Sequence, residues 1–218
     1  LAKLDATLRE AAETFDFNTY VRALTEFCNE DLSAFYFDIR KDCLYCDAAS
    51  DPKRMAYRTV LDTLFHALVR YAAPVLVFTS EEVWGTRYSD DGSVHLLEWP
   101  ELPAFERDKA MVIRNTELRA LRGQVTEAIE PLRRDKRVRS SLEAEITMSD
   151  LDVILRGLDR DHLAETFISG TVHLVPGHEG ITITPTTDHK CGRCWRHLPE
   201  VTEDGNLCNR CETVLNPA

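Results

Sequence analysis

The chain has 218 residues, of which 44% are hydrophobic and 29% charged, with nine glycines and nine prolines. These values exclude collagen-like, low-complexity and disordered chains, and they predict a globular protein large enough to bury one core or two. The net charge of −11 disfavours nucleic-acid binding unless the basic residues gather on one face. No apolar run reaches the ~18 residues of a membrane span, so we expect a cytoplasmic protein without membrane contact.

The first hundred residues are predicted to be helical. The opening stretch LAKLDATLRE is typical of an exposed amphipathic helix rather than a signal peptide. Apolar residues then recur at helical spacing after Asn18, which can cap a helix, and they continue past a short break. Asp51 and Pro52 indicate the start of a long helix, because Asp caps helices and Pro fits their first position. We therefore predict a helical bundle over residues 1–100, with one short strand at Val94 to Leu97.

A connector and a long basic helix are predicted for residues 101–140. Its apolar positions step by three and four, at Leu118, Leu121, Val125, Ile129 and Leu132. Residues 107–139 carry ten basic and five acidic side chains. This surplus is typical of a surface that binds a polyanion, and it is equally typical of a solvated helix face with ion pairs.

A small α+β subdomain is predicted for residues 141–186. The stretches SLEAEITM, TVHLVP and ITITPTT alternate apolar and polar residues as short strands do. Between them, SDLDVILRGL and DHLAETFI have helical patterns. The predicted fold class is therefore mainly α: a helical bundle, then this α+β subdomain, then a knuckle built on cysteines.

The last part of the chain, residues 187–218, contains two CxxC pairs. Cys191 and Cys194 form the first pair, Cys208 and Cys211 form the second, and 13 residues separate them. A loop of this length lets the pairs meet, and four thiolates complete a tetrahedral zinc site with no open position. We predict one structural Zn²⁺, which holds the fold and does not activate water.

Other roles for the cysteines are less favoured. Two disulfides do not suit a cytoplasmic chain, and redox CxxC motifs follow a strand at a helix start rather than occurring in duplicate at a terminus. His189 and His197 could replace a thiolate, but four thiolates already satisfy zinc, so surface positions or RNA contacts suit these histidines better. A third CxxC, Cys43 with Cys46, has no second ligand pair beside it in the sequence and is interpreted as buried and structural.

Catalytic motifs are not found in the sequence. It has no GxGxxG, P-loop, GxSxG or HExxH, and no pair of carboxylates can be assigned to acid–base chemistry. We therefore predict no catalytic residue. The chain begins at Leu1 without an initiator Met, which is what a piece of a longer protein would show.

Several stretches together resemble the C-terminal part of bacterial isoleucyl-tRNA synthetases. They are FCNEDLSAFYFDIRKDCLYCD, YAAPVLVFTSEEVW, RNTELRALRGQVTEAIEPLRRDKRVRSSLEAEI, and the cysteine motifs CGRCWRH and CNRC. The block from Asp31 to Trp84 resembles the helical anticodon-binding domain of the isoleucine, valine and leucine enzymes, and the CxRCW and SSLEA stretches are similar to the isoleucine enzyme. Cys43 departs from the Arg that is usual in KDRLY, which argues against an obligatory phosphate contact at this position.

The resemblance implies a division of labour within a longer class I ligase. Activation of isoleucine with ATP and Mg²⁺, transfer to tRNA and editing belong to upstream domains, and the HIGH and KMSKS signatures of catalysis do not occur in this sequence. The chain is thus expected to bind isoleucine-accepting tRNA, and no DNA, without charging it. The parent enzyme is expected to be a monomer.

The RNA contacts are predicted from charge and aromaticity. Basic side chains near the end of the long helix would position phosphates, namely Arg133, Arg134, Lys136 and Arg137. Trp195, flanked by Arg193 and Arg196, would stack on an unpaired anticodon base. Without the resemblance, a lid packed over the zinc thiolates explains Trp195 equally well.

Two other classes of protein fit part of the sequence. Formamidopyrimidine-DNA glycosylases end in a similar four-cysteine finger, but they need an N-terminal Pro-Glu, whereas this chain begins Leu-Ala-Lys. A zinc-stabilised protein interaction module would bind no nucleic acid, so RNA binding that falls steeply with salt would distinguish the present chain from such a module.

Overall fold

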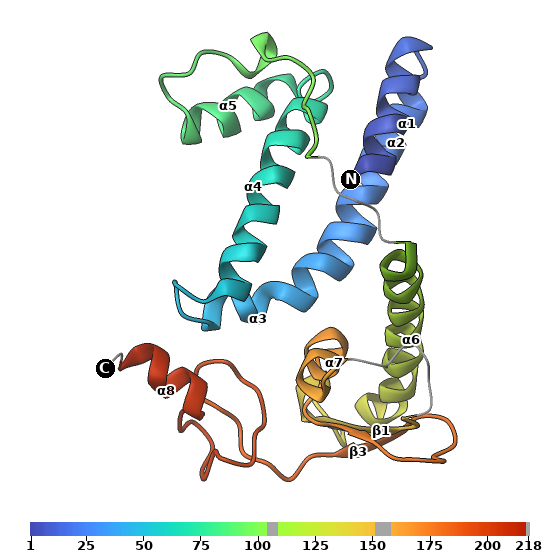
Figure 1. Ribbon diagram of the computed structural model, residues 1–218, viewed down its shortest axis with the longest axis vertical. Helices are drawn as coiled ribbons and strands as arrows, with labels where there is room; N and C mark the ends of the chain where they lie inside the picture. The colour runs from blue at the N-terminus through green and yellow to red at the C-terminus, as the bar shows by residue number, and fades with distance from the viewer. Residues whose placement is uncertain (104–108, 151–157, 217–218) are drawn as a thin grey trace. The chain divides into compact units, whose positions relative to one another are not determined.

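The computed structural model describes three stretches of the chain, residues 1–103, 109–150 and 158–216 (Figure 1). They are mainly helical, with one three-stranded sheet and one cluster of cysteines, which confirms the predicted fold class. None of the described helices is long and apolar enough to cross a membrane.

The chain divides into two compact units. Unit 1 consists of Leu1–Asp38 and Ala49–Phe105, and unit 2 consists of Ile39–Ala48 and Glu106–Ala218. The short segment Ile39–Ala48 lies inside the predicted bundle in sequence but belongs to unit 2 in space. The domain limits predicted at residues 100, 140 and 186 place this segment in the helical bundle and do not anticipate its assignment to unit 2.

Unit 1 is an all-helical assembly (Figure 1). Its elements are α1 (Ala2–Glu13), α2 (Phe17–Glu26), the π-helix η1 (Phe27–Phe37), α4 (Pro52–Ala72), α5 (Val77–Arg87) and the 3-10 helix η2 (Val94–Leu96). The break predicted after the first helical stretch is thus a change of winding rather than a loop. The amphipathic helix predicted at the N-terminus is confirmed as α1, whose Leu4, Leu8 and Ala11 are buried.

A half-buried carboxylate, that of Asp5, ties unit 1 together. Asp5 on α1 accepts hydrogen bonds from Tyr71 Oη at 2.5 Å and Trp99 Nε1 at 2.7 Å, and it pairs with Arg9 at 2.9 Å. Burial acts to raise the pKa of Asp5, but the bonds from these three side chains lower it below its ordinary value. Tyr20 completes the network by donating to the Tyr71 carbonyl at 2.8 Å.

The first residues of α4 and α2 test the two helix caps that were predicted for unit 1. The side chain of Asp51 accepts from the N–H groups of Lys53 and Arg54, so the predicted Asp-Pro start of α4 is confirmed. The predicted cap at Asn18 is wrong, because Asp16 starts α2 and accepts from Thr19 N–H at 3.1 Å. Both side chains make good caps, and the sequence does not decide between two such residues this close together.

The strand predicted at Val94 to Leu97 is also wrong. These residues form the 3-10 turn η2, followed by an extended Leu97. Glu81 on α5 accepts from the Val94 N–H at 3.0 Å and from the Ser93 hydroxyl at 2.8 Å. The turn is therefore held by a side chain of α5, and the alternation of apolar residues reflects packing of Val94 into the core of unit 1.

Unit 2 combines helices with a small sheet. Its elements are α3 (Asp38–Cys46), which begins one residue before the boundary, α6 (Lys109–Arg134), the 3-10 helix η3 (Ser141–Glu143), β1 (Ala144–Met148), α7 (Arg160–Phe167), β2 (Val172–Leu174), β3 (Thr182–Pro185) and α8 (Asn209–Leu215). The sheet order is β2-β1-β3, with β1 parallel to β2 and antiparallel to β3. The three predicted strands and the helix in DHLAETFI are confirmed, while most of SDLDVILRGL lies outside the described residues.

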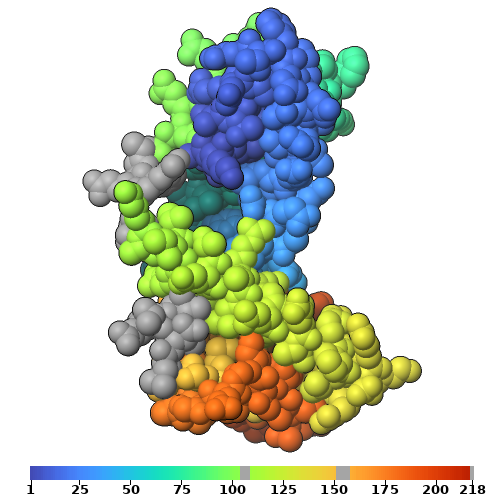
Figure 2. All heavy atoms as spheres, turned by 90° about the vertical axis from the view of Figure 1, so that its right-hand side faces the viewer, coloured from blue at the N-terminus to red at the C-terminus, as the bar shows by residue number. Residues whose placement is uncertain are grey.

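The core of unit 2 lies between α6, α7 and the sheet. Leu118, Val125 and Ile129 of α6 are buried against Ile146 of β1 and Phe167 of α7, and Leu121 and Leu132 pack beside them. The five predicted apolar positions of the long helix are thus confirmed as core. Because this face of α6 is used for packing, the basic residues near its end remain at the surface, in the region coloured yellow that projects from unit 2 in Figure 2.

Candidate metal centre and nucleic-acid interface

The four predicted cysteine ligands lie together in unit 2. Their sulfur atoms are all within 4.8 Å of one another, and the Sγ atoms of Cys194 and Cys208 are 3.8 Å apart. Zn–S bonds of ~2.3 Å in a tetrahedron place two sulfurs about 3.8 Å apart. All four cysteines are free thiols, so the alternative of two disulfides is not supported. The donor set and its spacing therefore fit one structural zinc ion.

The buried position of the four cysteines suits a bound cation. Cys191 and Cys211 have no exposed surface, and Cys194 is 8% exposed. Burial acts to raise the pKa of Cys191, but backbone N–H groups of Arg193, Cys194 and Cys208 donate to its sulfur and lower the pKa to about 6. Burial raises the pKa of Cys194 and of Cys208. Several thiolates this close together repel one another unless a divalent cation balances them.

The loop that carries the first cysteine pair requires a glycine. A Cβ at Gly192 would lie 2.3 Å from the Gly205 carbonyl oxygen, which is closer than real contacts allow. Gly192 N–H also donates to the Asn206 carbonyl at 3.0 Å, and Gly205 N–H donates to the Lys190 carbonyl at 2.9 Å. These bonds bring the two cysteine pairs together, because they connect the loop before the second pair to the first CxxC turn.

The two nearby histidines do not take part in the cysteine cluster. His197 Nδ1 lies 2.8 Å from the Asp188 carbonyl oxygen, and His189 Nδ1 lies 3.4 Å from a carboxylate oxygen of Asp204. Neither is among the four ligands that the described residues bring together. This placement is consistent with the surface positions expected from the sequence.

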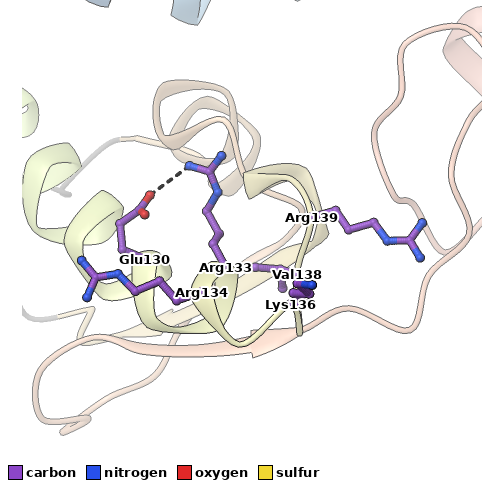
Figure 3. A pocket seen from close by; sticks show the side chains of 6 residues that line it. All are labelled: Glu130, Arg133, Arg134, Lys136, Val138 and Arg139. Atoms are coloured by element: carbon purple, nitrogen blue, oxygen red, sulfur yellow. Dashed lines mark hydrogen bonds and ion pairs between the residues drawn. The ribbon is translucent and has the colours of Figure 1, made fainter.

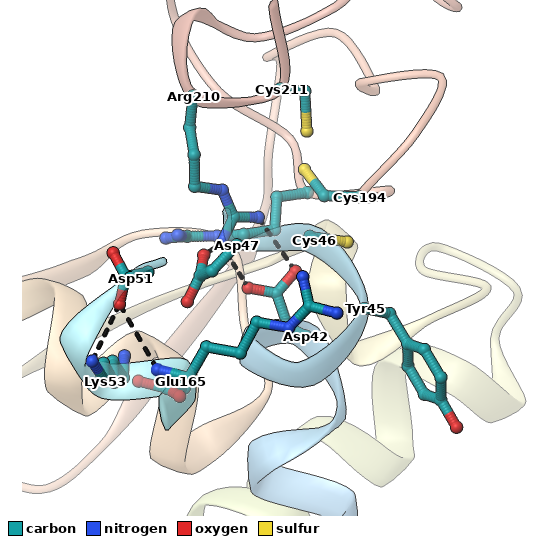
Figure 4. Close-up of polar contacts among 12 residues, drawn as sticks. Asp42, Tyr45, Cys46, Asp47, Asp51, Lys53, Glu165, Cys194, Arg210 and Cys211 are labelled. Atoms are coloured by element: carbon teal, nitrogen blue, oxygen red, sulfur yellow. Dashed lines mark hydrogen bonds and ion pairs between the residues drawn. The ribbon is translucent and has the colours of Figure 1, made fainter. Parts of the chain in front are cut away.

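The zinc knuckle, defined as residues 187–216, is attached to α3 by two arginines, of which Figure 4 labels Arg210. Arg210 bonds both oxygens of Asp42, at 2.7 and 2.9 Å, and one oxygen of Asp47 at 2.9 Å. Burial acts to raise the pKa of Asp42, but Arg210 holds it below the ordinary value. Since the ion pairs are largely shielded from water, Arg210 is a strong attachment between α8 and α3.

Arg193 makes the second attachment, through the backbone. Its Nη1 donates to the Cys46 carbonyl at 2.6 Å and its Nη2 donates to the Tyr45 carbonyl at 3.1 Å. The same guanidinium lies 3.5 Å from the sulfur of Cys211, which raises the pKa of Arg193. Arg193 therefore connects the metal ligands to the end of α3, because both of its terminal nitrogens donate to these groups.

The third CxxC, Cys43 with Cys46, is buried, as predicted, but the sequence did not indicate which residues pack beside it. Cys43 is 1% exposed and Cys46 is 7% exposed, and Cys46 packs in the same buried cluster as the four ligand cysteines. It lies outside the group whose sulfurs can share a metal ion. Burial raises the pKa of Cys46 to about 11, so it is a neutral thiol that packs against the knuckle.

Trp195, the aromatic residue predicted to contact RNA, is exposed to solvent. Trp195 has a positive φ of 66° and is 60% exposed, and it is not part of the buried cluster around the cysteines. Lys190 Nζ lies 5.2 Å from the centre of its ring, which is a cation–π contact. A lid over the thiolates is thus not the arrangement observed. Arg196, its neighbour, is mostly covered and lies 3.8 Å from Asp161.

Three of the four predicted basic residues line a shallow hollow in unit 2 (Figure 3). Its volume is about 570 Å³, and its lining residues are Glu130, Arg133, Arg134, Lys136, Val138 and Arg139. Arg133 donates to Glu130 at 2.9 Å, while Arg134 and Arg139 extend in different directions. Arg137 is exposed but does not line the hollow. Such an open basic surface suits an extended polyanion better than a small enclosed ligand.

Four residues of this region were not predicted from the sequence: Asp42, Asp47, Arg139 and Arg210. Arg139 lies in the basic stretch, so its position gave a signal. Arg210 lies 163 or more residues from each of the two aspartates in the chain, and the sequence contexts of all three are ordinary. Only the fold brings them together, and only their pairing distinguishes them from solvated surface charges.

Comparison with known families agrees with this geometry. Residues 1–148 match the family described as the anticodon-binding domain of tRNA ligase, and residues 188–214 match the zinc finger found in FPG and IleRS. The first match covers more than half of the chain, so the chain belongs to the anticodon-binding family of tRNA ligases.

Bacterial isoleucine–tRNA ligases are among the relatives of this chain. The chain is 51% identical to that of Zymomonas mobilis, 45% to that of Gluconobacter oxydans and 42% to that of Agrobacterium fabrum. The alignments cover 99%, 99% and 94% of this chain but 24%, 23% and 22% of the relatives. The chain therefore spans about a quarter of their length, and the resemblance to isoleucyl-tRNA synthetases is confirmed.

The zinc site yields the first testable prediction. Cys194→Ser should release zinc and unfold the knuckle, since structural zinc contributes an apparent free energy of about 10 to 16 kcal/mol at neutral pH. Zinc content by atomic emission and circular dichroism of the purified chain measure both effects. Cys28→Ser, a change at a half-buried thiol in unit 1, is the matched control and should retain one zinc per chain. A folded, metal-free wild type would contradict the site.

Proposed function

We propose that this chain binds the anticodon region of isoleucine-accepting tRNA as part of an isoleucine–tRNA ligase. The observation that carries the proposal is the combination of an anticodon-binding match over residues 1–148 with a knuckle whose four thiols fit zinc and match the isoleucine-enzyme type. The charging reaction, its ATP and Mg²⁺, the cytoplasmic location and a monomeric state are proposed for the parent enzyme by the same similarity.

Phosphate binding is assigned to the basic hollow of unit 2. Arg134, Lys136 and Arg137 are exposed, and no carboxylate among the described residues pairs with Arg134, whereas Arg133 shares its charge with Glu130. Cations that are not already paired gain most from phosphate, because no existing salt bridge is lost. This surface would fix the position of the RNA without reading its sequence.

Base reading is assigned to the zinc knuckle. Trp195 offers an exposed indole on a loop that the metal site makes rigid. Lys190 lies over one face of the ring, so a single base would stack on the other face. The neighbouring arginines have different uses, because Arg193 bonds α3 and Arg196 lies beside Asp161, and we therefore place Trp195 ahead of both.

The two alternative functions are less well supported. A glycosylase would share the four-cysteine finger but not the anticodon-binding match over residues 1–148. A protein interaction module would explain the zinc knuckle but not the open surface of arginines and lysine beside α6. A titration of the chain with tRNAs of different anticodons, at several salt concentrations, separates all three.

The isolated chain should not activate isoleucine. Its sequence lacks the HIGH and KMSKS signatures of the class I reaction, so isoleucine-dependent exchange of pyrophosphate into ATP should stay at background. Robust exchange by a preparation free of host synthetase would overturn the assignment of catalysis to other parts of the parent enzyme.

Trp195→Ala should weaken binding of isoleucine tRNA by about 1 to 3 kcal/mol, the contribution of one base stacked on an aromatic ring. Zinc content and thermal unfolding should stay close to the wild type, because the exposed ring is outside the buried cysteine cluster. Filter binding measures the affinity. If affinity is unchanged, or falls only together with zinc, base reading moves from the knuckle to the helical unit.

Arg134→Ala and Arg137→Ala should weaken binding of cognate and non-cognate tRNA about equally. Each should also reduce the slope of log affinity against log salt by roughly one unit or less, since one phosphate contact is lost. Arg22→Ala, which removes an exposed arginine of α2, is the control for net charge. Selective loss of cognate binding would show instead that these arginines read bases.

A further inference from the structure

Unit 2 has few aromatic side chains, and two of them are exposed. Its aromatic residues are Tyr45, Phe167 and Trp195. Phe167 belongs to the core, whereas Tyr45 is 73% exposed and Trp195 is 60% exposed. Both exposed residues are connected to Arg193 through the chain, because Arg193 donates to the Tyr45 backbone carbonyl and stands two positions before Trp195.

The backbone that carries Tyr45 is anchored on both sides. Arg193 holds the carbonyls of Tyr45 and Cys46, at 3.1 and 2.6 Å. Arg210 holds Asp42, three residues earlier, and Asp47, two residues later. Cys46, the next residue, is buried among the zinc ligands. The last turn of α3 is thus fastened to the zinc knuckle, while the tyrosine ring points away from these contacts (Figure 4).

An exposed ring on an anchored backbone suits a binding residue. Single exposed aromatic residues are common and need no function. A ring on a backbone that is already immobilised, however, loses little further entropy when a ligand stacks on it. Unpaired bases are the ligands that such rings accept in RNA-binding proteins, because each base offers a flat π-face.

We propose that Tyr45 is a second stacking position for an unpaired RNA base, and that the zinc knuckle holds it in place through Arg193 and Arg210. This inference rests on the proposed tRNA-binding function. It makes Arg193 and Arg210 positioning residues: their donors bond α3, and they act on RNA through Tyr45. The RNA contact predicted for Arg193 from the sequence is thereby replaced by this indirect role.

The first test uses the complete chain and two RNAs. One is a hairpin with an isoleucine anticodon loop, and the other is a fully paired duplex of the same stem. Tyr45→Ala should weaken hairpin binding about ten-fold or more, as loss of one stacked base does, and should leave duplex binding unchanged. Tyr45→Phe, which keeps the ring, should bind the hairpin nearly as the wild type does. Phe78→Ala removes an 89% exposed ring of α5 and is the matched control.

The second test addresses the role of the knuckle. Asp42→Asn weakens the Arg210 attachment without changing a residue next to a zinc ligand in the sequence. It should lower hairpin affinity several-fold with zinc content unchanged, and this loss should vanish when Tyr45 is already Ala. Such non-additivity is the signature of two residues that act as one unit.

The results separate the inference from the function on which it rests. If the wild type does not bind the hairpin, the proposed function fails. If the wild type binds but Tyr45→Ala binds equally well, or loses duplex binding to the same extent, Tyr45 is not a stacking position. If Asp42→Asn lowers affinity equally in both backgrounds, the knuckle does not act through Tyr45.

Discussion

The contact on which unit 2 depends is the crowding of four buried thiols within 4.8 Å. Without a cation, such a cluster could ionise only in part, because neighbouring thiolates repel one another. With zinc, the loops become a fixed platform. Arg193 touches a ligand sulfur, and Arg210 follows a ligand cysteine by two residues, so the metal also fixes two arginines that bond α3. The influence of the metal therefore extends beyond the four ligands.

The attachment of the zinc knuckle to α3 matters because α3 lies almost entirely in the segment Ile39–Ala48, which two criteria assign differently. In sequence it lies within residues 1–148, which match the anticodon-binding domain, yet in space it belongs with the cysteine knuckle and α7. Arg40 extends the connection by pairing with Glu165 of α7 at 3.0 Å. A part of the family's helical domain is consequently built into the zinc-containing unit. The two sequence families matched by the chain are thus not two independent structural modules.

Much of this arrangement could be predicted, for definite physical reasons. Some features depend only on residues that are close together in the sequence, so the sequence was enough to predict them. They are the five apolar positions of α6, the Asp51 cap and the paired CxxC motifs. The errors at Asn18 and at Val94 to Leu97 arose where a nearby competitor, Asp16 or Glu81, took the bond. The attachments of Arg193 and Arg210 could not be predicted, because they join residues about 150 or more positions apart whose charges look like ordinary surface charges.

The three tryptophans differ in their access to solvent. Trp84 is 4% exposed in the core of unit 1, and Trp99 is half-buried against Tyr71, whereas Trp195 stands on the surface of the zinc knuckle. A water-soluble quencher such as iodide therefore reaches one indole far more readily than the other two. The intrinsic fluorescence of the protein contains a component that reports on the knuckle alone, so events at the metal site can be followed optically without attaching a dye.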